Sequence, residues 1–278
     1  MNPPSVRDVL EAAAREAPES QERWRLVTEL HRRDDQATFS AAERMLSSPA
    51  VERRILAIDV LAQMGAEAGN AVEDRRFRNP AIAVLLPLLS PETDPAVLKS
   101  VAIAFSHLSD ERAIPALHDL RRHSDPQVRR GATFGLLGLD VDLAVEALIE
   151  LTTDSDLDVR DWATFGLGTQ LDRDTPALRA ALVGRLDDTE ADTRAEALRG
   201  LARRGDPRMI RALLAAFDEP HELSDPDILE AALLEIASRT GNERLKPLIE
   251  QRLRAQRQAF PDDPMPADLA AAAARVRH

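Results

Sequence analysis

A two-residue pattern that recurs along most of the chain constrains the fold more than any other sequence feature. A small or β-branched residue is followed four positions later by a large apolar one, at Ala57/Leu61, Val101/Phe105, Ala132/Leu136, Ala163/Leu167, Ala197/Leu201 and Ala232/Ile236. Residues four apart lie on the same face of an α-helix. Self-similarity at a spacing of roughly 20 to 50 residues indicates a stack of repeated units. The pattern therefore predicts six repeats, each with one helix that buries this face.

These helices have recognisable starts. An Asp or Ser followed by Pro precedes most of them, at Ser48-Pro49, Asp94-Pro95, Asp125-Pro126 and Asp225-Pro226, and Asp156-Leu157 precedes another. The Asp or Ser side chain accepts hydrogen bonds from the first free amides, and Pro at the first helical position loses none. Shorter amphipathic segments lie between these helices, for example at 113–120, 144–151 and 209–214. The order predicted along the chain is helix, short turn, helix, short turn.

The composition favours an all-α fold. Aromatic residues make up 3% of the chain, Tyr is absent, and hydrophobic residues reach 44%. Strands would need runs of β-branched and aromatic residues at period two, bounded by turn residues. No such run occurs in this sequence. The predicted fold class is therefore all-α, with enough apolar material for a sizeable core.

Two segments resemble a known family. The sequences Asp-Pro-Gln-Val-Arg-Arg-Gly-Ala at 125–132 and Asp-Leu-Asp-Val-Arg-Asp-Trp-Ala at 156–163 resemble the second helix of HEAT repeats, particularly the short bacterial kind related to phycobilisome lyases. The resemblance extends over 35–240 and implies a right-handed α-solenoid of about six HEAT-like helix pairs with helical caps. In that family the Asp and Arg of the motif form a ladder between neighbouring repeats. By this resemblance Arg129, Arg160 and Arg194 are structural.

The ends of the chain depart from the repeat pattern. We expect an N-terminal helical cap over 1–34, the repeat array over 35–240, and a capping helix and tail over 241–278. An irregular insertion at 66–80 accounts for the long spacing between the first two repeats. A Pro-rich segment at 261–266 separates an Ala-rich tail helix, for which we expect mobility.

The charge disfavours nucleic acid as a partner. The net charge is −12, and nine acidic residues stand against the single Arg160 between Asp140 and Asp172. Binding to phosphates needs a basic face instead. Part of this acidity has a structural explanation, since acidic residues stabilise the first turns of helices. Without cysteine, a leader-like segment or a long apolar run, we expect a cytoplasmic protein that does not cross a membrane.

No motif in the sequence points to an active site. The six histidines have no spacing typical of metal ligands on one helix, and the single His221-Glu222 pair is interpreted as a loop feature. No phosphate-binding glycine loop or nucleophile elbow is present, and Gly166-Leu167-Gly168 falls within a helical pattern. We predict no catalytic residue, no metal ligand and no cofactor.

A binding surface is predicted on the outward side of the second helices. On a helical wheel at about 100° per residue, Phe165 points away from the buried stripe of its helix. The equivalent positions in successive repeats are Asp59, Ile103, Phe134, Phe165, Arg199 and Leu234. By the HEAT resemblance this side lines a concave groove, so the predicted partner-binding residues are Ile103, Phe134, Trp162, Phe165, Arg199 and Arg203. The alternatives are that both Phe side chains pack between helices, that Trp162 packs on an adjacent repeat, and that the two arginines are solvated.

Three functional hypotheses follow. The first is a non-enzymatic scaffold that binds a protein or peptide, with the acidic residues favouring a basic one. The second is a bilin lyase-like ligand-binding protein, which would need more aromatic contacts than this composition offers. The third is a HEAT-like DNA glycosylase, which requires a basic groove with a Trp and a catalytic Asp. The sequence leaves the oligomeric state open.

Overall fold

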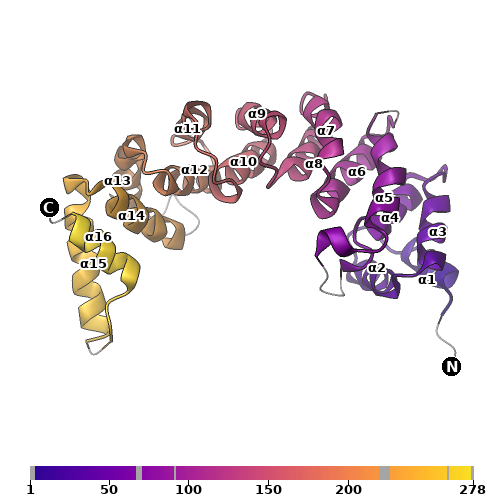
Figure 1. The fold of residues 1–278 in the computed structure, drawn as a ribbon, viewed down its shortest axis with the longest axis horizontal. Helices are drawn as coiled ribbons and strands as arrows, with labels where there is room; N and C mark the ends of the chain where they lie inside the picture. The colour runs from indigo at the N-terminus through magenta and orange to yellow at the C-terminus, as the bar shows by residue number, and fades with distance from the viewer. Residues whose placement is uncertain (1–3, 67–70, 91, 219–225, 262, 277–278) are drawn as a thin grey trace. The chain divides into compact units, whose positions relative to one another are not determined.

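The computed structural model describes residues 4–66, 71–90, 92–218, 226–261 and 263–276 (Figure 1). Over these ranges the regular elements are sixteen α-helices with short 3-10 or π turns, and no strand occurs among them. The all-α prediction is confirmed. None of the helices in these ranges combines the length and the apolar character needed to span a lipid bilayer.

The chain folds into two compact units, residues 1–147 and 148–278. Unit 1 contains α1 (Val6–Ala13), α2 (Gln21–Arg33), α3 (Gln36–Met45), α4 (Val51–Ala62), α5 (Arg78–Leu85), α6 (Pro95–Leu108), α7 (Ile114–Leu120) and α8 (Pro126–Leu136). The boundary falls within α9 (Asp142–Leu151). Unit 2 contains α10 (Leu157–Phe165), α11 (Pro176–Val183), α12 (Ala191–Arg203), α13 (Ile210–Asp218), α14 (Pro226–Thr240), α15 (Lys246–Ala259) and α16 (Ala267–Arg275). The division into a cap, an array and a tail stays a prediction.

The repeat pattern corresponds to real helix pairs. The second helices α4, α6, α8, α10, α12 and α14 hold the six recurring positions, except that Leu167 lies in the turn that continues α10. Both members of each pair of positions are buried, from Ala57 and Leu61 to Ala232 and Ile236. Within unit 2, the first helices α11 and α13 lie along one side and the second helices α10, α12 and α14 along the other (Figure 1). The predicted α-solenoid fold is confirmed.

The predicted helix starts are confirmed at three helices and wrong at one. Asp94, Asp125 and Asp156 cap α6, α8 and α10, and each side chain accepts a hydrogen bond from an amide of the first turn. The helix α4 instead begins at Val51, because the Ser48 hydroxyl accepts from the Ala50 amide within the preceding turn. Asp225 lies outside the described residues, as do His221 and Glu222.

Two segments expected to be irregular or mobile are packed into the fold. Within the insertion, Phe77 is buried and stacks on Phe39, with ring centroids 5.3 Å apart. Residues 67–70 of the insertion lie outside the described residues. The expected mobility of the tail is wrong, because α16 packs against α14 and α15 and buries Leu269 and Ala273. Its Ala-rich sequence contains an apolar stripe, which gives the helix a face to bury.

Close backbone approach brings two second helices of unit 2 together. The chain continues α10 into one π turn, Gly166–Gln170, which lies against α12. A Cβ atom added to Gly200 would stand 2.6 Å from the Cα of Gly168 and 2.8 Å from the Leu182 side chain. Arg204 donates to the carbonyl oxygens of Leu167 and Leu171 at 2.9 and 2.8 Å. These hydrogen bonds supply a side-chain donor to backbone carbonyl groups in and just after the π turn.

This close approach yields a stability prediction. Gly200→Ala should lower the free energy of unfolding by about 1 to 3 kcal/mol, because the added methyl group overlaps the facing backbone. Gly184→Ala is the matched control, since its Cβ would meet nothing nearer than 3.4 Å. Urea denaturation followed by circular dichroism measures both changes. Equal stability of the two variants would show that the Gly168–Gly200 contact does not limit the packing of α10 on α12.

Candidate functional site

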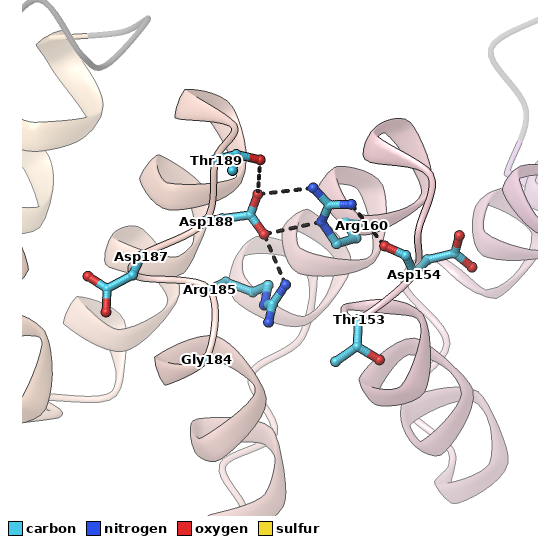
Figure 2. Close-up of a pocket in the computed structure, with 8 residues that line it drawn as sticks. All are labelled: Thr153, Asp154, Arg160, Gly184, Arg185, Asp187, Asp188 and Thr189. Carbon is cyan, nitrogen blue, oxygen red and sulfur yellow. Dashed lines mark hydrogen bonds and ion pairs between the residues drawn. The ribbon is translucent and has the colours of Figure 1, made fainter.

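A buried carboxylate joins two repeats of unit 2 (Figure 2). Asp188 is 8% exposed and accepts hydrogen bonds from Arg160 at 3.2 Å and from Arg185 at 2.9 Å. Burial alone would raise the pKa of Asp188, but the hydrogen bonds from Arg160 and the Glu190 amide, together with the two guanidinium charges, lower it overall. The Asp188 side chain is therefore ionised and paired at neutral pH.

The same arginine contact recurs from repeat to repeat. Arg129, Arg160 and Arg194 each donate to a backbone carbonyl of the turn before their own helix, those of His123, Asp154 and Asp188, at 2.8 to 2.9 Å. Contacts of this kind agree with a structural role for the three arginines, and the predicted ladder between repeats is formed by Arg160, which also pairs with Asp188 of the next repeat at 3.2 Å. The hollow of about 350 Å³ in Figure 2 is lined by Arg160, Arg185 and Asp188 among others, and both of these guanidinium groups already pair with the Asp188 carboxylate. We do not assign it as the binding site.

The predicted site residues of unit 1 are half-buried. Ile103 on α6 and Phe134 on α8 are neither core nor fully exposed. The guanidinium carbon of Arg130 lies 5.7 Å from the centroid of the Phe134 ring, which is a cation–π distance. At the equivalent position of α4, Asp59 pairs with the buried Arg23 at 2.9 Å. The predicted row is therefore not a continuous apolar surface, and its role in binding stays a prediction.

The two predicted arginines of α12 differ in their surroundings. Arg203 donates to the carbonyl oxygens of Gly168 and Thr169 and pairs with Asp172 at 2.6 Å. Its guanidinium thus stabilises the π turn. Arg199 is half-buried one turn earlier on the same helix. Partner binding by either arginine stays a prediction, and Arg203 would have to exchange existing contacts to take part.

Trp162 and Phe165 share a pocket with acidic side chains that sequence reasoning did not connect to them. Their rings meet edge to face, with centroids 5.5 Å apart. They line a hollow of about 260 Å³ together with Asp161 of α10, Asp192 and Glu196 of α12, and Ile228 of α14. We call this set the aromatic–acidic pocket. Asp161 belongs to the acidic stretch noted in the sequence, but nothing in the sequence indicated that α12 supplies two more carboxylates.

The negative charge of Asp161 in this pocket destabilises the folded protein. Burial, together with the negative charges of Asp192, Glu196 and Asp158, raises the pKa of Asp161 to about 6. A hydrogen bond from the neutral Thr193 hydroxyl, at 3.3 Å, acts in the opposite direction. On Glu196, one oxygen accepts from the Thr169 hydroxyl at 2.8 Å. The pocket therefore holds concentrated negative charge beside two aromatic rings, a combination that attracts cations.

Comparison with known proteins identifies the repeats. The sequence profile of HEAT repeats matches residues 145–224, which include α10 and α12 and five of the six pocket residues. Residues 145–224 are therefore HEAT repeats. The sequence matches no curated protein.

Solved structures support the same repeat fold. YibA of Escherichia coli is 18% identical with a TM-score of 0.70, and the match covers 100% of this chain and 98% of YibA. The HEAT-like repeats protein of Thermococcus onnurineus is 14% identical with a TM-score of 0.51, covering 85% of this chain and 97% of the archaeal one. A chain from the CpcE–CpcF complex of phycocyanin lyase from Nostoc is 17% identical, with coverages of 86% and 96% and a TM-score of 0.43. At these identities the first two show the fold of the HEAT repeats alone, and the third carries no inference.

The unfavourable charge on Asp161 leads to a pH-dependent prediction. With its folded pKa raised above the unfolded value, the Asp161 carboxyl favours folding when protonated, and this contribution is lost as pH rises from about 4 through about 6. Asp161→Asn should therefore raise the free energy of unfolding at pH 7.5 by about 1 kcal/mol, reduced from the full shift by solvent screening, and change it little at pH 4. Urea denaturation at both pH values measures this. Asp187→Asn, at an exposed position of the same unit, is the control. A loss of stability at pH 7.5 in the Asp161→Asn variant would contradict the conclusion that the ionised Asp161 carboxylate destabilises the fold.

Proposed function

We propose that this protein is a non-enzymatic interaction module that binds a basic segment of another protein on the second-helix side of unit 2. The observation that carries the proposal is the aromatic–acidic pocket. Its members come from α10, α12 and α14, so a segment lying across these three helices could contact all of them. A scaffold of this kind matches the first of the three functional hypotheses and narrows the binding surface to unit 2.

The physical chemistry of the pocket favours a cationic peptide over the other two classes of ligand. Aromatic rings provide apolar area with little loss of side-chain entropy, and carboxylates select cations by charge. The phosphates of DNA are anionic, as are the propionate groups of a bilin, and three carboxylates would repel both. The pocket thus supports neither the glycosylase nor the lyase-like hypothesis. Cytoplasmic localisation stays a prediction that the pocket does not bear on.

A peptide array tests the proposal. Labelled protein is applied to immobilised 12-residue peptides of randomised sequence, and we expect the bound sequences to be enriched in Arg and Lys. The double variant Trp162→Ala, Phe165→Ala should lose at least about tenfold in affinity for the selected peptides, because buried aromatic anchors carry much of the energy of such interfaces.

The control variant comes from the same helix. Leu157 begins α10 and is 48% exposed, so Leu157→Ala removes exposed apolar surface outside the pocket. This variant should bind like the unmodified protein, and circular dichroism should show that both variants remain helical. Selection of acidic peptides, or equal binding by the double variant and the control, would overturn the proposal.

A further inference from the structure

The repeats of α8 and α10 place different side chains beside the same aromatic position, which is Phe134 in one and Phe165 in the other. The helix segments 125–136 and 156–167 align without gaps, so Arg130 corresponds to Asp161 and Phe134 to Phe165. In α8 the guanidinium of Arg130 lies over the Phe134 ring at 5.7 Å. In α10 the position of that arginine is held by Asp161, which lines the pocket beside Phe165. The repeat in unit 2 thus has a carboxylate where the repeat in unit 1 has the cation for its ring.

A second difference enlarges the aromatic surface. The residue aligned with Gly131 of α8 is Trp162, whose ring meets Phe165 edge to face. Gly131 packs against the backbone of Lys99, where a side chain would not fit, whereas Trp162 faces the hollow. The α10 repeat therefore presents two rings in the place where the α8 repeat presents one ring and its own arginine.

We infer that the aromatic–acidic pocket receives an arginine side chain of the bound partner, which takes the place that Arg130 occupies over Phe134 in the preceding repeat. The inference rests on the proposed function, because it names the residue by which the basic segment is anchored. The hollow of about 260 Å³ is smaller than the roughly 300 to 1,000 Å³ of pockets that hold whole small molecules. Its size suits one side chain.

The distribution of the carboxylates favours arginine over lysine. Asp161 stands on α10, while Asp192 and Glu196 stand on α12, so acceptors border the rings on more than one side. A guanidinium is planar, stacks on an aromatic face and donates in its own plane in several directions. An ammonium is compact and more strongly hydrated, so it loses more on leaving water. Hydrogen bonds from Thr193 and Thr169 already orient the Asp161 and Glu196 carboxylates.

The two tryptophans of the chain allow a direct test. The sequence has no Tyr, and Trp24 is 42% exposed on α2, so Trp24→Phe leaves Trp162 as the sole strong fluorophore. Blocked pentapeptides Gly-Gly-X-Gly-Gly are titrated into this protein, with X as Arg, Lys or citrulline, at constant ionic strength. We expect a saturable change in Trp162 emission with Arg, about fivefold or more weaker binding with Lys, and no binding with the neutral citrulline.

Two sets of variants locate the effect, each made in the Trp24→Phe background. Asp192→Asn combined with Glu196→Gln should weaken binding of the Arg peptide at least tenfold, whereas Asp187→Asn should leave it unchanged. Asp161→Arg restores the α8 arrangement and should block the Arg peptide by supplying an internal guanidinium. Circular dichroism checks that each variant is folded.

The outcomes separate this inference from the proposed function. Equal binding of the Arg, Lys and citrulline peptides, or undiminished binding to the Asp161→Arg variant, would overturn the arginine assignment. If peptide arrays select sequences that depend on Trp162 and Phe165 but contain no arginine, the interaction module stands and the assignment fails. If no peptide of any class binds, both fail.

Discussion

Within each unit, the structure depends on the packing of second helices against neighbouring helices through a stripe of small and apolar residues. Ala132, Ala163 and Ala197 lie at the centres of these stripes and are fully buried. A helix pair of this length cannot bury its apolar face alone, so each repeat is stable only when its neighbours cover it. Small residues let the backbones approach, and at Gly168 and Gly200 the approach leaves no room for a Cβ atom. This packing determines which side of every second helix is buried.

The remaining positions of each helix are then available for other contacts. The starts of the helices hold the Asp caps and the arginines that bind the preceding turn. Arg160, for example, donates to the Asp154 carbonyl of that turn and also to the Asp188 carboxylate of the next repeat. The position that Phe165 holds in its repeat is not constrained in this way. The residue type there differs between repeats, for example Asp59 in the first and Leu234 in the last. Variation at that position changes the surface of a repeat while its core stays the same. Binding chemistry can therefore differ between repeats of one fold.

The sequence was sufficient for features that depend on local chemistry. The helices, their buried stripe and their Asp caps follow from residues within one helix, and the contact of Arg160 with the next repeat follows from the family resemblance. The start of α4 was missed because a Ser hydroxyl can serve a turn as well as a helix. Arg203 was predicted on a binding face, and the π turn that uses its hydrogen bonds has no recognisable sequence pattern. The partners of Trp162 were missed because Glu196 and Ile228 come from other repeats, and their distances depend on how repeats pack.

The carboxylate of Asp161 connects stability with binding. The fold itself does not require an acid there, since the aligned residue of α8 is Arg130 and that helix forms equally well. A half-buried Asp beside three other acids disfavours its own ionised form, which is why its pKa rises to about 6. A guanidinium in the pocket would reverse this balance, because an adjacent cation favours the ionised carboxylate and lowers its pKa. By linkage, binding would release a proton from Asp161 and be stronger above about pH 6 than below it. The repulsion between Asp161 and its acidic neighbours destabilises the free protein. A bound guanidinium would offset this repulsion, so the buried negative charge would favour the complex over the free protein.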